Sequence, residues 1–212
     1  YYRDLEGQVV NRNFARLLVN QRVETEVLPA IGQAYGGEFS LNFQIRKWEV
    51  KSAYVYSRSL QRTPILPDVA VVNGGEWFPS DFDAPHNITI TAIWKARKSV
   101  TYSLNFVYRT GRPVSVPVGV YPIFPSFQVP AFSERNQYRI PDYHRLDISA
   151  TFDRQVIKRS RSKSEVVLSL YNLYGRNNPF SVYFQRGGGG FEAYQLSVLG
   201  AALPMLSYNF RF

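Results

Sequence analysis

The sequence contains no cysteine, which excludes disulfide bonds, thiolate metal sites and cysteine nucleophiles. It also has no apolar run near the ~20 residues that a transmembrane helix needs, so no helical span is expected. No signal peptide is recognisable, because Tyr1 opens directly into the segment YYRDLEGQVV, as mature and truncated chains do. Methionine occurs once and leucine-rich runs are few, which argues against a mainly helical fold.

Aromatic residues are abundant: 15 tyrosines, 15 phenylalanines and 3 tryptophans make up 16% of the 212 residues. Aromatic side chains favour strands over helices. They also gather where the apolar band of an outer-membrane barrel meets water. The mean hydropathy of −0.24 resembles that of a soluble protein. A barrel can have the same value, because half of each barrel strand faces a polar lumen.

The net charge of +9 raises the question of nucleic-acid binding. The basic residues are scattered over predicted strand ends and loops, and no recognition motif accompanies them. The one basic cluster, Lys158, Arg159, Arg161 and Lys163, falls in a predicted turn. We therefore expect no nucleic-acid partner.

Apolar and polar residues alternate through the last residues of the chain. Leu206, Tyr208, Phe210 and Phe212 fall on one side of an extended strand, whereas Arg211 falls on the other. The same two-residue period recurs upstream, and no segment shows a helical period over a similar length. The strands predicted in this way span residues 34–46, 48–60, 86–97, 100–112, 143–154, 165–174 and 206–212, with residues 1–10 as a weaker candidate.

The predicted connections alternate between short and long. Short links occur at 46–47 and 97–99, and a somewhat longer one covers 156–164. Transmembrane β-barrels combine short periplasmic turns with long extracellular loops. We therefore predict an all-β fold, a transmembrane antiparallel β-barrel with aromatic side chains toward lipid and small polar side chains toward the lumen. The long links, rich in proline, glycine and asparagine, span 11–33, 61–85, 113–142 and 175–193.

If the last strand ends at the periplasm, counting back along the strands places each short turn at the inner, periplasmic interface of the membrane and each long loop outside. Trp48 and Trp94 fall beside these turns, where an inner girdle of aromatic residues is expected. The basic side chains of the turns can extend from there toward water.

Seven sequence blocks stand out beyond their alternation, and the most specific is RIPDYHRLD at 139–147. The others are GQAYGGE at 32–38, YSRS at 56–59 with NGGEWFP at 73–79, DAPHN at 83–87, YRTGRP at 108–113, YNLYGRNNP at 171–179 and the terminal Phe212. In this order and strand phase, they resemble the late barrel strands of TonB-dependent outer-membrane receptors of the Bacteroidetes type.

The resemblance implies a barrel of about 22 strands that encloses an N-terminal plug domain. Residues 1–212 are then expected to form the C-terminal part of one barrel domain, about its last eight strands. The plug, the N-terminal energy-coupling box and the earlier strands would lie outside this sequence. The implied function is TonB-dependent uptake of a scarce nutrient, such as a siderophore, a glycan or a peptide, in the cell outer membrane. The ligand itself cannot be identified from these residues.

The resemblance also implies a set of partners. They are outer-membrane lipid and lipopolysaccharide, the rest of the barrel and its plug, the inner-membrane energy-coupling protein TonB, a surface lipoprotein lid and the barrel-assembly machinery. Tyr208, Phe210 and Phe212 are the expected C-terminal assembly signal.

No residue set predicts catalysis, a cofactor or a metal site. His86 and His144 lie before different strands, and structural or interfacial roles are favoured over a metal pair. Asp142 and Asp147 flank Arg145, and we interpret them as bonded lumen or interface groups rather than as an acid–base pair. The glycine run at 187–190 lacks the helix and the Lys-Ser or Lys-Thr of a phosphate cradle, which favours a flexible outer loop.

Two aromatic loops are the candidate contact sites for a ligand or a lidding partner. Trp77 and Phe78 occupy one loop, and Tyr121, Phe124 and Phe127 occupy a proline-rich second loop. Packing of each loop on its neighbours is the alternative interpretation. For the whole chain, the alternatives to uptake are a barrel that serves as an anchor or structural subunit of a larger membrane assembly, and a soluble β-sandwich binding module.

Overall fold

The computed structural model describes residues 1–13, 23–65, 67, 71–124, 127–155, 163–187 and 190–211. Its regular structure consists of β-strands and two short 3-10 turns, η1 (Val23–Glu26) and η2 (Asn73–Gly75). Within these residues, no helix is both long and apolar enough to cross a membrane. The fold is all-β and antiparallel, in agreement with the sequence-based prediction.

One antiparallel sheet contains most of the chain. Its strands are β1 (Tyr2–Asn11), β2 (Val27–Ile45), β3 (Trp48–Arg62), β4 (Phe78–Pro79), β5 (His86–Arg97), β6 (Val100–Arg109), β11 (Tyr143–Gln155), β12 (Lys163–Tyr171) and β15 (Leu203–Arg211). They are ordered β1-β2-β3-β5-β6-β11-β12-β15, with the short β4 beside β3. The long strands thus form a meander, and the strands predicted from the alternating pattern are confirmed.

The long strand β2 begins earlier than predicted. Residues 27–33 were expected to belong to a loop, but they pair with β1 from Val27 opposite Asn11 to Gly32 opposite Leu5. Leu28 and Ala30 are buried in this stretch, so tertiary packing extends the strand beyond the region of regular alternation.

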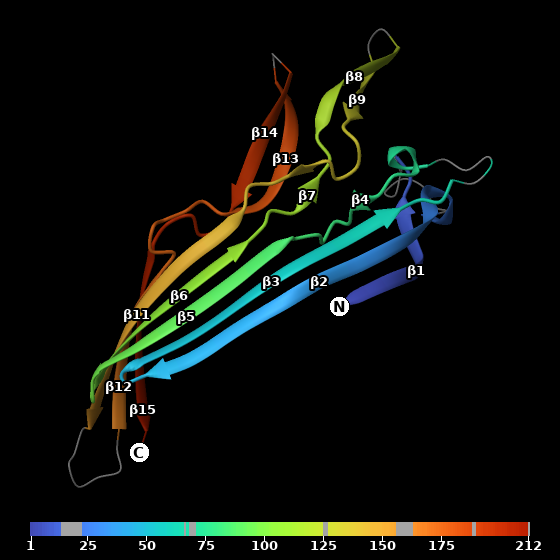
Figure 1. Cartoon of the computed structure of the whole chain (residues 1–212). Helices are drawn as coiled ribbons and strands as arrows, with labels where there is room; N and C mark the ends of the chain where they lie inside the picture. Colours follow the sequence, from blue (N-terminus) through green and yellow to red (C-terminus); the bar gives the residue numbers. More distant parts are fainter. Residues whose placement is uncertain are drawn as a thin grey trace.

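Three further strand pairs form in the connections that we predicted as loops, and the last of their strands runs to Ser197, beyond the predicted loop end at residue 193. They are β7 (Pro113–Val114) with β10 (Tyr138–Arg139), β8 (Pro117–Phe124) with β9 (Phe127–Phe132), and β13 (Pro179–Gly187) with β14 (Gly190–Ser197). The last two hairpins project from one end of the main sheet (Figure 1). The turns at 46–47 and 98–99 lie at the other end, as the alternation of link lengths predicts. The link at 156–162 lies outside the described residues.

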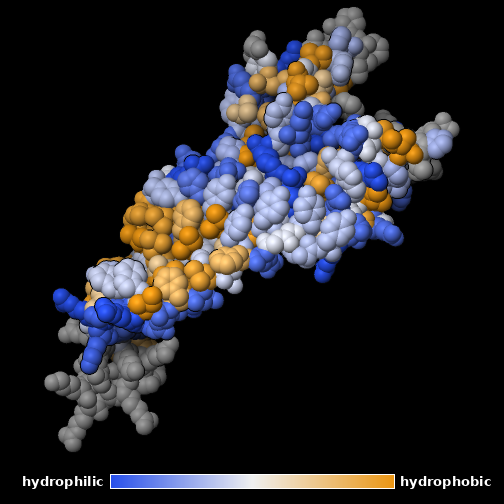
Figure 2. All heavy atoms as spheres, in the orientation of Figure 1, coloured by the Kyte–Doolittle hydropathy of each residue, from blue (hydrophilic) through white to orange (hydrophobic). Residues whose placement is uncertain are grey.

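The register of the meander separates its two faces. Cross-strand partners share a face, so the pairs Trp48–Trp94, Val50–Ala92 and Leu104–Ile148 place apolar side chains on one face across successive strands. Polar pairs such as Thr91–Asn105 lie on the other face. We call these the apolar face and the polar face. Figure 2 views the apolar face, where hydrophobic residues gather over the half of the sheet nearer the short turns.

The main sheet is curled and open. In Figure 1, β12 and β15 lie behind the strands at the front of the view, so the apolar face is convex. Among the described residues, β1 and β15 each pair with a single neighbour. Closure into a barrel is therefore not part of this structure.

The interior packing is confined to the end that carries the long loops. Val10, Leu28, Ala30, Val72 and Phe78 form the hydrophobic cluster there. The total accessible area is 15080 Å², whereas a compact soluble protein of 24.4 kDa exposes roughly 10,000 Å². The excess arises because the main sheet has no second layer over either face, in the residues described, and because two hairpins project from its end.

We predict that Phe78→Ala lowers the free energy of unfolding by about 3 kcal/mol, because it leaves a cavity in this cluster. Phe82, which is 80% exposed, supplies the matched control, and Phe82→Ala should change stability by less than about 0.5 kcal/mol. Denaturant titration of the two variants measures the difference. Equal effects would contradict the assignment of the cluster.

Candidate functional site

A buried carboxylate connects the long loops to the ends of the strands. Asp83 is 1% exposed and accepts hydrogen bonds from the Ser59 backbone N–H at 2.7 Å and from Arg58 Nε at 3.2 Å. Arg139 forms an ion pair with the same carboxylate and also donates to the backbone oxygens of Asp83 and Gly111, at 2.8 and 2.9 Å. With its oxygens occupied, Asp83 acts as a structural anchor for the loops.

Two asparagines join the loop at 61–85 to the loop at 113–142. Asn73 accepts from the Arg135 backbone N–H at 2.8 Å and donates to its carbonyl oxygen at 3.0 Å. Asn136 Nδ2 donates to Pro79 O at 2.8 Å and to Asp81 Oδ1 at 2.7 Å. Because these bonds run in both directions, the two loops form one connected body. Sequence reasoning missed both asparagines, although Asn next to glycine or at a turn is a usual signal for backbone with positive φ.

The aromatic loop residues predicted to contact ligand lie in different environments. Phe78 packs in the interior cluster and is 2% exposed, so its side chain faces no solvent in this conformation. Trp77 lies at the surface under the Arg62 guanidinium, whose carbon is 4.8 Å from the ring centroid. Tyr121 is exposed on β8. Phe124 pairs with Phe127 at the tip of that hairpin, but the placement of their side chains is outside the described part of the structure.

The residues of the expected assembly signal lie on the edge strand. Tyr208 and Phe210 both point from β15 on the apolar face, opposite Val166 and Ser164, and both are exposed. Phe212 lies outside the described residues.

A positively charged hollow of about 380 Å³ opens on the polar face at the loop end of β6, β11 and β12. We call it the arginine hollow, and it is lined by Arg109, Arg112, Arg145, Tyr143, Tyr171 and Asn172 among others. No acidic residue lines it in the described part of the chain. Sequence reasoning did not single out Arg109 and Arg112, because the hollow forms only when three strands bring them beside Arg145.

Among the arginines that line the arginine hollow, Arg145 makes the most polar contacts with the described residues. Its Nε and Nη2 both lie 3.0 Å from Asp147 Oδ2, and its Nη1 donates to the Tyr143 and Tyr171 hydroxyls. The guanidinium carbon also lies 4.1 Å from the centroid of the Tyr171 ring. Arg112 donates to Phe180 O at 2.9 Å, and it forms no ion pair with an acidic side chain among the described residues. The hollow therefore suits contact with acidic or hydrogen-bond-accepting groups.

The two predicted acids are occupied by donors. Asp142 accepts from the Tyr108 hydroxyl at 2.6 Å and from the Gly111 backbone N–H at 2.8 Å, whereas Asp147 accepts from Arg145 and from the Asn172 backbone N–H. Burial acts to raise the pKa of Asp142. The hydrogen bonds from Tyr108 and Gly111, with nearby Arg139 and Arg176, outweigh it and hold this pKa below its ordinary value of 3.8.

The histidines join tyrosines in a row across the apolar face, near its loop end. His86 Nδ1 lies 2.9 Å from the Tyr54 hydroxyl, and His144 Nδ1 lies 2.7 Å from the Tyr174 hydroxyl. Tyr108, opposite His144, continues the row. We call this the outer aromatic row. No group of three or more potential metal-ligating side chains occurs among the described residues.

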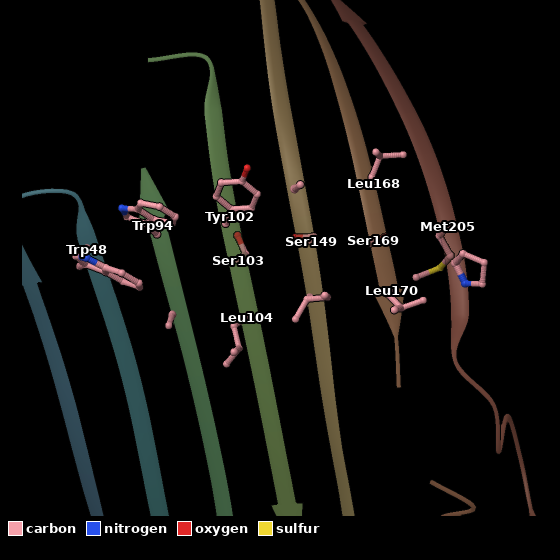
Figure 3. Close-up of a pocket in the computed structure, with 14 residues that line it drawn as sticks. Trp48, Trp94, Tyr102, Ser103, Leu104, Ser149, Leu168, Ser169, Leu170 and Met205 are labelled. Atoms are coloured by element: carbon pink, nitrogen blue, oxygen red, sulfur yellow. The ribbon is translucent and has the colours of Figure 1, made fainter. Parts of the chain in front are cut away.

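A second aromatic row crosses the apolar face beside the short turns. The rings of Trp48 and Trp94 stack with centroids 5.5 Å apart, and those of Trp94 and Tyr102 are also 5.5 Å apart. Figure 3 shows the three rings side by side on β3, β5 and β6. We call this the inner aromatic row.

The glycine run sits at a hairpin tip. Gly187 ends β13 and pairs with Gly190, which begins β14 with φ 139°. Gly188 and Gly189 lie outside the described residues. The run thus joins two strands and does not open a helix.

Comparison of the sequence with family models and with curated proteins, and a search of solved structures, gave no significant match.

We predict that Gly111→Ala loosens the loop body. A Cβ at Gly111 would lie 1.8 Å from Ile140 O, so the two chain segments would have to separate. Gly119→Ala is the control, because a Cβ there meets nothing within 4 Å. Limited proteolysis should cut the 113–142 loop several-fold faster in Gly111→Ala only. Equal cleavage of both variants would contradict the close packing.

The Asp142 contacts predict a dependence on pH. Because the folded pKa is lowered, the stabilisation by this carboxylate is complete above its ordinary pKa of 3.8 and is lost as pH falls through the lower folded value. Resistance of the 113–142 loop to an acid-active protease should therefore decline only below about pH 4. Asp142→Asn should remove this decline, and an unchanged decline would assign it to another group.

Proposed function

We propose that this chain is part of a transmembrane β-barrel of a Gram-negative-type outer membrane. We further propose that the barrel belongs to a TonB-dependent receptor, of which residues 1–212 form the C-terminal portion. The observation that carries the proposal is the uncovered apolar face, which a water-soluble protein would have to bury.

The composition of the apolar face supports a bilayer as the missing layer. Between the inner and outer aromatic rows, no charged residue occupies this face of β3, β5, β6 and β11. The rows are six to eight residues apart along β3, from Trp48 to Tyr54 and Tyr56. At ~3.4 Å per residue this is roughly 20–27 Å, comparable with the ~25 Å apolar band of such barrels before strand tilt is considered.

The polar face supports a wide lumen. Many of its side chains between the rows are small and polar, such as Ser103, Asn105 and Ser149, with Lys51, Ile93 and Val107 among the larger ones, and this composition suits a wide lumen better than a packed narrow barrel. In hydrocarbon the free edges of β1 and β15 would need backbone partners. Additional strands of the same barrel would supply them, as the proposed larger barrel requires.

The uptake function draws on the sequence blocks that resemble TonB-dependent receptors, such as residues 139–147. In the structure this block holds both Arg139, which anchors the loops, and Arg145, which lines the arginine hollow. A cationic patch on the lumen side of the loop body suits contact with a nutrient or with a plug. The outer loops carry exposed Val118 and Tyr121, and this favours a second candidate, a barrel that docks a partner protein as a subunit of a larger assembly.

We predict that the two faces differ in their tolerance of charge. Leu104→Arg places a cation on the apolar face and should cost roughly 2–4 kcal/mol near the membrane midplane, so assembly in the outer membrane should fail. The neighbouring Ser103→Arg on the polar face should assemble normally. Membrane fractionation and heat-modifiable gel migration measure assembly. Equal tolerance of both substitutions would refute the membrane orientation.

Uptake itself is tested in the organism that carries the gene. Deletion should abolish growth on one limiting nutrient, and removal of the energy-coupling protein should give the same loss. Normal growth on each nutrient, together with a co-purifying partner complex, would favour the subunit function instead.

A further inference from the structure

A β-bulge near the short turn between β5 and β6 redirects one arginine. Lys95 pairs with Thr101, but Arg97 pairs with Val100, so Ala96 is the extra residue. In an unbroken strand, Arg97 would share the polar face with Lys95. The bulge instead gives it a partner on the face of Tyr102, which lies two residues from Val100.

The bulge is held by the neighbouring hairpin. Lys47 Nζ donates to Ala96 O at 2.8 Å, and the Lys95 backbone N–H donates to Lys47 O at 2.8 Å. These contacts join the two short turns, and they bring the Lys47 ammonium to the Ala96 carbonyl, next in sequence to Arg97; Lys98 follows in the turn. The nearest acid on β3, Glu49, is paired on the polar face with Lys51 and Lys95. The end of the apolar face is thus cationic.

Arg97 lies among aromatic side chains. Together with Trp94, Tyr102 and Phe152 it lines a hollow of about 470 Å³ on the apolar face. The β-bulge directs the Arg97 side chain into this hollow. Its guanidinium has no hydrogen bond or ion pair with the described residues. An arginine beside the inner aromatic row therefore has donors available for an anionic group.

An apolar hollow of about 600 Å³ continues from this site along the sheet (Figure 3). It shares Trp94 and Tyr102 with the Arg97 hollow, and Leu104, Ile148 and Leu168 line its far part. Ala92 and Ala150 leave room between the larger side chains. The two hollows together combine a cationic end with an apolar extension, at the level where the bilayer would meet water.

We propose that these joined hollows form a binding site for an anionic phospholipid. The phosphate accepts hydrogen bonds from Arg97 beside the stacked rings of Trp94 and Tyr102, and one acyl chain lies along the apolar hollow. The proposal rests on the membrane location proposed above. An anionic lipid fits better than a neutral one, because Lys47 and Lys98 add positive charge and no acid on this face balances them within the described residues.

The test uses the full-length protein extracted from its membrane. Dissociation constants for phosphatidylglycerol, phosphatidylethanolamine and inorganic phosphate are measured by native mass spectrometry in a neutral detergent. Arg97→Gln should weaken phosphatidylglycerol binding about tenfold, as expected for one charge-assisted hydrogen bond. Lys95→Gln removes the same charge two residues away on the polar face and should leave the constant unchanged.

The outcomes separate this site from the proposed function. Membrane fractionation comes first, and absence of the protein from the outer membrane would refute its location. With the location intact, equal weakening by both variants, equal affinity for the two lipids, or phosphate binding as tight as lipid binding would overturn the lipid site.

Discussion

Antiparallel backbone pairing determines which way each side chain of the main sheet points, and the other features follow from that register. Because neighbouring partners share a face, Trp48, Trp94 and Tyr102 come together from three strands, whereas Thr91 and Asn105 meet on the opposite side. A shift of one residue in any pair would exchange the two faces of a strand. The same ladder of backbone hydrogen bonds thus determines the apolar face, the two aromatic rows and the arginine hollow.

The strands were predictable from sequence because their signal is local. A two-residue alternation identifies β5, β6 and β11 without knowledge of their partners. The start of β2 was not predictable, since Leu28 and Ala30 are buried by contacts distant in sequence. The hairpins β8–β9 and β13–β14 were also missed. They stand away from the main sheet, so the alternation between an apolar and a polar face is not imposed on their residues.

The candidate sites were less accessible to sequence analysis than the strands. Trp77 and Phe78 are adjacent aromatics, yet one lies at the surface and the other in the interior cluster. The arginine hollow forms only when three strands pair in register. Arg97 reaches the apolar face only because of a β-bulge, and no residue type in the sequence predicts that bulge. Such features arise from pairing between segments, whereas a sequence displays only each segment by itself.

The reciprocal bonds between Asn73 and Arg135 have a consequence for how this surface can diversify. Asn73 bonds to the backbone N–H and carbonyl of Arg135, so the contact between the two loops requires the Asn73 side chain but no particular side chain at position 135. The exposed side chain of Tyr121, on β8, forms no hydrogen bond with the described residues. Substitutions can therefore accumulate at Tyr121 while Asn73 and the strands beneath the loops stay constant.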